Sequence, residues 1–153
     1  MSDEFSSLNI AILLPCYNEE KSIAKVVLDF RRALPGVRVF VYDNNSIDGT
    51  AQQAARAGAT VVPSLRQGKG NVVRQMFADI DADIYLMADG DGTYDPTAAP
   101  EMIQTLLTKR VDMVVGTRRD VTLDAGRKGH AFGNKLFNKV YHLLFGKDFT
   151  DIF

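Results

Sequence analysis

Short apolar runs alternate with helix-like stripes along most of this chain, and this alternation limits the fold more than any other feature of the sequence. The first run, residues 9–14, is nearly continuous and suits a strand covered on both faces. Apolar residues then recur at positions 23, 26, 27, 30 and 34, a spacing that predicts an amphipathic helix ending at Pro35-Gly36. Strands alternating with helices form mostly parallel sheets, so the predicted fold is α/β: an open, mostly parallel Rossmann-like sheet with helices on both faces. We expect the other strands at residues 37–42, 60–62, 84–88 and 113–116, and the other helices at residues 50–57 and 72–80, after Asp95-Pro96, and at residues 132–144.

The composition indicates one folded domain over residues 1–153. With 46% hydrophobic and 24% charged residues, the chain is neither disordered nor collagen-like. Its formal net charge of -1 provides no general attraction to nucleic acid, so we expect no nucleic-acid partner. The single cysteine, Cys16, has no partner for an internal disulfide and forms no nucleophile signature with either histidine, His130 or His142. No signal-peptide pattern and no apolar run near the roughly 20 residues that span a bilayer are present, so a cytoplasmic location is expected.

Acidic and basic residues are segregated along the chain despite the small net charge. Residues 81–101 contain acids but no bases, whereas bases predominate in residues 109–147. This arrangement suits a site that holds a metal cation together with an anionic ligand. The alternative is that both segments are simply solvated faces.

Polar clusters follow most of the predicted strands, where an open α/β sheet binds its ligands. The most informative is Asp89-x-Asp91, because its two carboxylates leave a buried strand together and a glycine stands on either side of Asp91. Divalent cations such as Mg²⁺ and Mn²⁺ prefer these oxygen ligands and bridge them to phosphate oxygens. In the alternative interpretation these acids form turns only, and Asp95 caps the next helix.

Other polar residues favour an anionic ligand with a base or ribose. Asp43 ends a strand, where a carboxylate is well placed to accept hydrogen bonds from a base or ribose, while Asp48 or Thr50 is expected to cap the following helix. Lys69 stands between two glycines at the start of a helix, as an anion site requires. Basic side chains further along could neutralise phosphates or could simply be solvated: Arg118, Arg119, Arg127 and Lys128.

Together and in this order, these clusters resemble the family 2 glycosyltransferases of the GT-A fold, and most of all the branch of polyprenyl-phosphate sugar synthases. The resemblance implies that Pro15, Tyr17, Glu19 and Asp43 hold the base and ribose, with Lys69 and Arg118 near the phosphates or the acceptor. It also implies that Asp89 and Asp91 bind Mg²⁺ or Mn²⁺, that Asp89 contacts the nucleotide, and that Asp91 and Arg118 are catalytic. Many of these synthases have Gln two residues after the second Asp, where this chain has Thr93, so no third protein ligand is assigned. The matching stretches are LLPCYNEE (13–20), VYDNNSIDGT (41–50), RQGKGNVVR (66–74), MADGDGTYDP (87–96) and VVGTRR (114–119).

The implied activity is transfer of a sugar from a UDP- or GDP-sugar to an acceptor, a polyprenyl phosphate at the cytoplasmic membrane face, usually with inversion. Such an acceptor is already anionic and needs no general base. Two alternatives stay open: a sugar-1-phosphate nucleotidyltransferase, although PCYNEE stands where those enzymes carry a glycine-rich signature, and a non-catalytic nucleotide-binding or oligomerising module. Related enzymes usually continue past this length, so we expect a truncated donor-binding part that transfers sugar weakly alone. Its apolar residues Phe149, Ile152 and Phe153 would favour homo-oligomers.

Overall fold

The computed structural model describes residues 7–116 of the 153-residue chain. The chain divides into two compact units, residues 1–114 and 115–153, and the sheet belongs to the first. The helix expected at residues 132–144 and the basic residues Arg118, Arg119, Arg127 and Lys128 lie outside the described residues.

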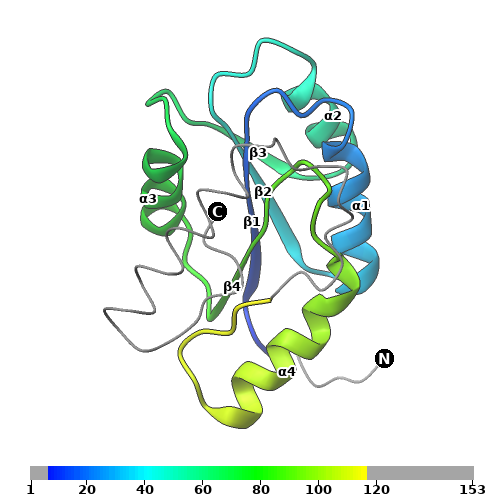
Figure 1. Ribbon diagram of the computed structural model, residues 1–153, viewed down its shortest axis with the longest axis vertical. Coiled ribbons are helices and arrows are strands. Elements are labelled where there is room, and N and C mark those ends of the chain that lie inside the picture. Colours follow the sequence, from blue (N-terminus) through cyan, green and yellow to red (C-terminus); the bar gives the residue numbers. More distant parts are fainter. Residues whose placement is uncertain (1–6, 117–153) are drawn as a thin grey trace, which may run out of the picture. The chain divides into compact units, whose positions relative to one another are not determined.

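Four parallel strands form the sheet in the order β3-β2-β1-β4 (Figure 1). The strands are β1 (Ile10–Cys16), β2 (Arg38–Asp43), β3 (Thr60–Pro63) and β4 (Ile84–Met87), which confirms four of the expected strands and the α/β class. Their register places Cys16 opposite Asp43 and Asp43 opposite Pro63, so the carboxyl ends of the first three strands meet at one edge.

The prediction of a fifth strand at residues 113–116 is wrong for the described part of the chain. These residues form no strand, and the side chains of Met113 and Val115 are 75% and 71% exposed. The run is apolar enough for a strand, but a strand exists only where a neighbour completes its hydrogen-bond ladder, and no such pairing is present among residues 7–116.

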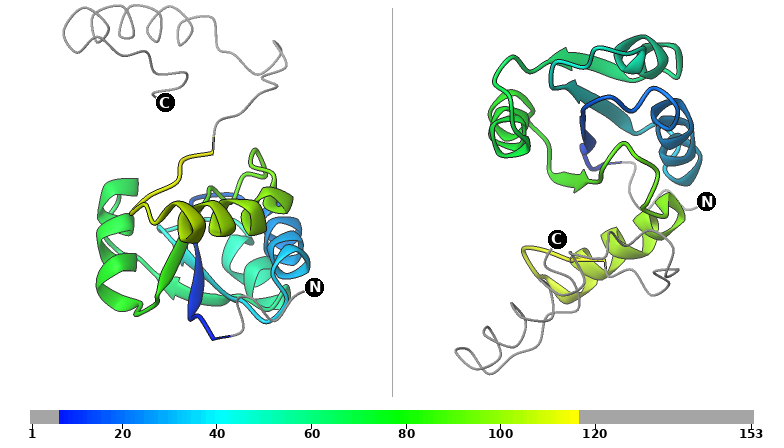
Figure 2. Two further views of the ribbon diagram at one scale, coloured as in Figure 1. Left: turned by 90° about the horizontal axis from the view of Figure 1, so that it is seen from below. Right: turned by 45° about the horizontal axis from the view of Figure 1, so that its top comes forward.

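Helices cover both faces of the sheet, as expected. They are α1 (Ile23–Ala33), α2 (Thr50–Arg56), α3 (Lys69–Asp79) and α4 (Ala99–Lys109), the last preceded by a 3₁₀ turn, η2 (Pro96–Ala98). Because side chains alternate along β1, Ile12 and Leu14 join the core beneath α1, α2 and α4, whereas Ala11 and Leu13 pack against α3. Figure 1 and Figure 2 show α3 alone on one side of the sheet and α1 and α2 on the other.

Acidic side chains contact the backbone at the start of two helical segments, η2 and α2. Asp95 accepts a hydrogen bond from the Thr97 N–H at 2.9 Å, which confirms it as a cap, although of η2 rather than of α4 directly. The N-cap of α2 is Gly49, so neither of the two expected residues occupies the cap position. Asp48, one residue earlier, accepts the N–H of Thr50, the first helical residue, at 3.0 Å.

We predict that Ile103→Ala lowers the free energy of unfolding by about 2–5 kcal/mol, because Ile103 is only 2% exposed and lies in the α1 core cluster. Urea denaturation followed by circular dichroism measures this change. Leu107→Ala in the same helix is the control, since its 39% exposed side chain should lose no more than about 1 kcal/mol. Equal losses for the two variants would contradict the packing described here.

Candidate functional site

A cavity of about 180 Å³ lies at the carboxyl edge of the sheet, between the loops that follow β1 and β4 and the start of α3. It brings together residues that are far apart in sequence, and most of the predicted site residues are among them. Asp43 does not line the cavity, and Arg118 lies outside the described residues. The lining residues are Pro15, Cys16, Tyr17, Glu19, Asn44, Lys69, Val72, Asp89 and Asp91.

The Asp89-x-Asp91 pair keeps two carboxylate oxygens available for a cation. Asp89 Oδ1 accepts a hydrogen bond from the Lys69 ammonium at 2.5 Å, and Asp91 Oδ1 accepts from the N–H and hydroxyl of Thr93 at 2.9 and 2.8 Å. The second oxygen of each carboxylate accepts no hydrogen bond from residues 7–116. The donor set therefore fits a hard divalent ion. No group of three His, Cys, Asp or Glu side chains suited to a metal occurs in the described part of the chain.

Thr93 has a definite place in this arrangement. Its hydroxyl and its N–H both bind Asp91 Oδ1, so Thr93 fixes the orientation of that carboxylate. At the position where many of the enzymes that this chain resembles carry Gln, the chain thus has a threonine that positions Asp91.

Glu19 is the most perturbed acid of the site. Burial raises the pKa of its carboxyl from the ordinary 4.5 to about 7; the Cys16 thiol lowers it, and the nearby charges of Asp91 and Asp89 raise it further. Glu19 Oε2 is buried and has no hydrogen-bond partner among the described residues. Such a group is satisfied either by holding a proton or by receiving a donor from a ligand. The buried Cys16 thiol has its pKa raised by burial and by Glu19, which leaves it protonated and unsuited to be a nucleophile.

Gly90 allows this close packing. A Cβ atom at position 90 would collide with the Glu19 carboxylate and the Cys16 sulfur, and would also press on Ile23. The glycine between the two aspartates is therefore required by the approach of β1 and its loop, not by turn conformation.

Asn44 connects the end of β2 to the loop before α3. Its side-chain amide donates to the carbonyls of Ser64 and Arg66 at 2.7 and 2.8 Å and accepts the Gly68 N–H at 2.8 Å, while its own N–H donates to the Cys16 carbonyl. Asn44 is 5% exposed, so all these polar groups are satisfied in a buried setting. They fix the loop that carries Lys69. The sequence places Asn44 in the polar cluster after β2 but gives no sign of its role, because the partners of its side chain lie 20 to 24 residues away.

The loop after β2 is tied in turn to the loop after β1. The Glu19 N–H donates to the Thr50 hydroxyl at 2.7 Å, and the Gly49 N–H donates to Glu20 Oε2 at 2.7 Å. Asp43, half-buried at the end of β2, accepts the Ser46 N–H at 3.2 Å. Asp43 thus supports the loop beside the cavity while its carboxylate stays close to that edge.

Comparisons with known proteins match almost the whole chain. The family model "Glycosyl transferase family 2" matches residues 11–152. Protein RfbJ of Shigella flexneri is 56% identical over 127 residues, which cover 82% of this chain and 98% of RfbJ. Glycosyltransferase AglJ of Haloferax volcanii is 41% identical over 145 residues, 94% of this chain but 47% of AglJ. The chain thus spans about half the length of AglJ.

Solved structures agree with these relatives. Glucosyl-3-phosphoglycerate synthase from Mycobacterium tuberculosis, in complex with Mn²⁺, UDP and glucosyl-3-phosphoglycerate, aligns with a TM-score of 0.61 and 29% identity. The alignment covers 68% of this chain and 41% of the synthase. The four-stranded sheet and its helices are therefore the GT-A fold, as the sequence predicted.

We predict that Gly90→Ala lowers the free energy of unfolding by about 1–3 kcal/mol, because the new methyl group overpacks against Glu19 and Cys16. Gly70→Ala is the matched control. Nothing lies within 4 Å of its added Cβ and position 70 is helical, so this variant should gain up to about 1 kcal/mol. Thermal and urea unfolding measure both, and a Gly90→Ala variant as stable as the wild type would show that the loops do not pack as described.

We predict that Glu19 makes stability fall as pH rises. A carboxyl whose folded pKa is raised contributes stability that is fully present below its unfolded value of 4.5 and is lost as pH passes about 7. Glu19→Gln should therefore be more stable than the wild type in mildly alkaline buffer, and this advantage should shrink toward acid. Urea unfolding across that pH range tests the slope, with Glu101→Gln, an exposed acid of α4, as the control for one lost charge. An advantage independent of pH would contradict the assignment.

Proposed function

Because the chain belongs to glycosyltransferase family 2, we propose that it binds the diphosphate of a UDP- or GDP-sugar in this cavity and transfers the sugar to a polyprenyl phosphate. The observation that carries the proposal is the convergence of Lys69, Asp89 and Asp91 on one cavity at the carboxyl edge of the sheet. Family membership argues against the nucleotidyltransferase alternative. The complex of the related synthase with Mn²⁺ and UDP supports the donor and the metal.

Asp89 and Asp91 are the residues that would hold Mg²⁺ or Mn²⁺, through the oxygens that no described residue occupies. When bound, the ion would offset negative charge that develops on the departing diphosphate. Lys69 neutralises Asp89 in the structure, and its flexible stem allows the ammonium to turn to a phosphate once a cation sits on that carboxylate. Lys69 is the first residue of α3, and the backbone N–H groups at that end of the helix also favour an anion.

Pro15, Tyr17, Glu19 and Asp43 are proposed to hold the base and ribose. Tyr17, 51% exposed beside the cavity, offers an aromatic face for a base, and Glu19 Oε2 is an acceptor still without a donor. Asp91 and Arg118 are proposed to act on the reacting sugar and phosphates.

In the reaction an oxygen of the acceptor phosphate attacks the anomeric carbon while the bond from that carbon to the diphosphate oxygen breaks. The electron pair leaves with the nucleoside diphosphate, and no proton needs to be removed from the acceptor. A relative named dolichyl-phosphate hexose transferase, from Haloferax volcanii, supports this acceptor class at 27% identity over 97% of this chain.

A lipid-linked acceptor lies in a membrane, so the enzyme must meet it at the membrane surface. We propose that the protein associates peripherally with the cytoplasmic face of that membrane. Within residues 7–116, no helix has the length and apolar character needed to cross a bilayer.

Isothermal titration calorimetry with UDP and GDP in the presence of Mn²⁺ tests the donor site. We predict that Asp91→Asn weakens binding by more than about tenfold, since the amide keeps the contacts to Thr93 but loses the charge. Asp95→Asn is the matched control, because Asp95 makes the same contacts to Thr97 yet lies outside the cavity.

Three results would decide against this proposal. Equal binding by Asp91→Asn and the wild type would remove the metal role of Asp91. Absence of any Mn²⁺-dependent nucleotide binding would remove the donor site. Nucleotide binding by the protein without sugar transfer would favour the non-catalytic alternative.

A further inference from the structure

Two large apolar side chains project from the loops at the carboxyl edge. Ile47, after β2, is 90% exposed, and Leu65, after β3, is 81% exposed, the highest values among the large hydrophobic residues described. Single exposed apolar residues are common and need no explanation. The exposure of Ile47 and Leu65 does need an explanation, because their loops are held in place and because two arginines lie beside Leu65.

Side-chain amides fix the backbone of both residues. Asn18 Oδ1 accepts the Ile47 N–H at 2.9 Å, and Asn45 Nδ2 donates to the Leu65 carbonyl at 3.1 Å. Asn18 and Asn45 themselves adopt left-handed conformations, with φ of 56° and 64°, which asparagine tolerates better than most residues. These contacts hold the backbone of the two loops at Ile47 and Leu65.

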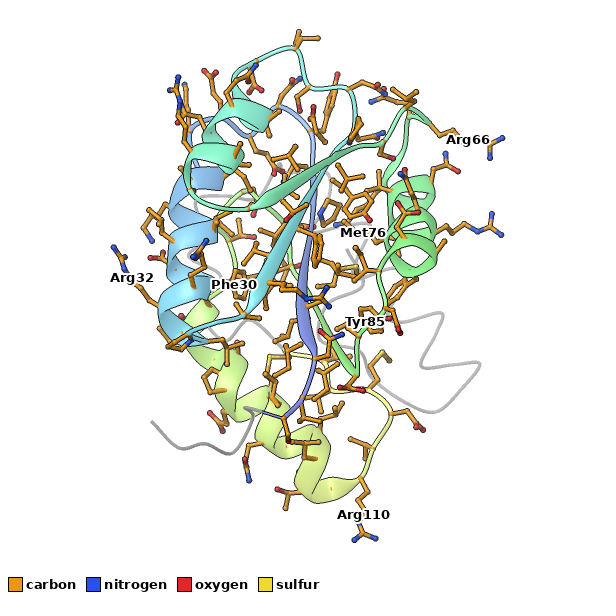
Figure 3. All side chains as sticks on the ribbon, turned by 180° about the vertical axis from the view of Figure 1, so that it is seen from behind. Phe30, Arg32, Arg66, Met76, Tyr85 and Arg110 are labelled. Atoms are coloured by element: carbon orange, nitrogen blue, oxygen red, sulfur yellow. The ribbon has the colours of Figure 1, made fainter. Side chains whose placement is uncertain are left out.

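A second cavity, open and about 560 Å³ in volume, lies beside Leu65. Arg66 and Arg74 line it from the loop and from α3, together with Pro63, Asn71 and Gln75, and no acid lines it. Neither guanidinium has a hydrogen-bond or ion-pair partner within residues 7–116, whereas Arg32 on α1 is paired with Asp29. Figure 3 shows Arg66 extending away from the molecule at this edge.

Acids of the neighbouring elements accept hydrogen bonds, among them Asp43 at the end of β2, which accepts the Ser46 N–H. Asp79 on α3 accepts hydrogen bonds from Gln75 and from the Tyr42 hydroxyl, and Asp48 beside Ile47 accepts from Thr50 and Glu20. None of these acids lines the second cavity, so the lining itself carries two cations and no anion.

We propose that Ile47, Leu65, Arg66 and Arg74 form a surface that docks on anionic lipid headgroups. Arg66 and Arg74 bind lipid phosphates, which match the guanidinium fork, while Ile47 and Leu65 enter the interface between headgroups and acyl chains. This inference rests on the proposed function, because it identifies the face that an enzyme with a lipid-linked acceptor presents to the membrane. The docking surface and the donor cavity share one edge of the sheet, so a docked enzyme would hold its site close to the headgroups.

Co-sedimentation of the full chain with lipid vesicles tests the docking surface. We expect binding to vesicles of phosphatidylglycerol and phosphatidylcholine, and binding weaker by at least about tenfold to phosphatidylcholine alone. The double variant Arg66→Gln/Arg74→Gln should lose at least about tenfold on anionic vesicles, as should Ile47→Ser/Leu65→Ser. The controls are Arg32→Gln and Leu28→Ser on α1, which remove an exposed cation and a 43% exposed apolar side chain elsewhere and should bind like the wild type.

Several outcomes would overturn the proposal: no binding of the wild type to anionic vesicles, equal losses in the α1 controls, or displacement from vesicles by inorganic phosphate, which would make the cavity a site for soluble anions. Calorimetry with UDP and Mn²⁺ on each variant separates this test from that of the donor site. Variants that keep nucleotide binding but lose vesicle binding support the docking surface. If the wild type itself does not bind UDP with Mn²⁺, the result would instead count against the proposed function.

Discussion

The parallel pairing of β1 with β2 on one side and β4 on the other is the constraint on which the rest of the structure depends. β1 is buried along its whole length, so it can hold its place only as a central strand with helices on both faces. Parallel pairing sends the loops after β1, β2 and β4 to the same edge. Glu19, Asn44 and Asp89 are thereby brought to one cavity, although they belong to separate parts of the sequence.

Short-range polar contacts then turn this edge into an ordered site. Asn44 holds the loop before Lys69, Thr50 holds the backbone of Glu19, and Thr93 orients Asp91. Side-chain amides act in the same way beside the cavity, where Asn18 and Asn45 hold the backbone of the exposed residues Ile47 and Leu65. Loops arranged before a ligand arrives lose less entropy when it binds, which favours tighter binding.

Much of this could be predicted from the sequence, because apolar periodicity reports burial directly. The four strands, the helices α1 to α4 and the grouping of Glu19, Lys69, Asp89 and Asp91 follow from it and from the rule that ligands bind at strand carboxyl ends. The rest depends on contacts between distant segments. Asn44 looks like any turn residue until its partners are known, and the fifth strand failed because periodicity does not show whether a pairing partner exists.

The central claim is that one cavity holds the metal and the nucleotide diphosphate together, and nuclear magnetic resonance with Mn²⁺ and UDP tests it most directly. Paramagnetic Mn²⁺ broadens amide signals close to it. We predict broadening at Gly90, Thr93 and Lys69 that requires UDP for its full extent, with Arg110, at the C-terminal end of α4 in Figure 3, unaffected. Broadening at Arg110 equal to that at Gly90, or none at Gly90, would contradict it.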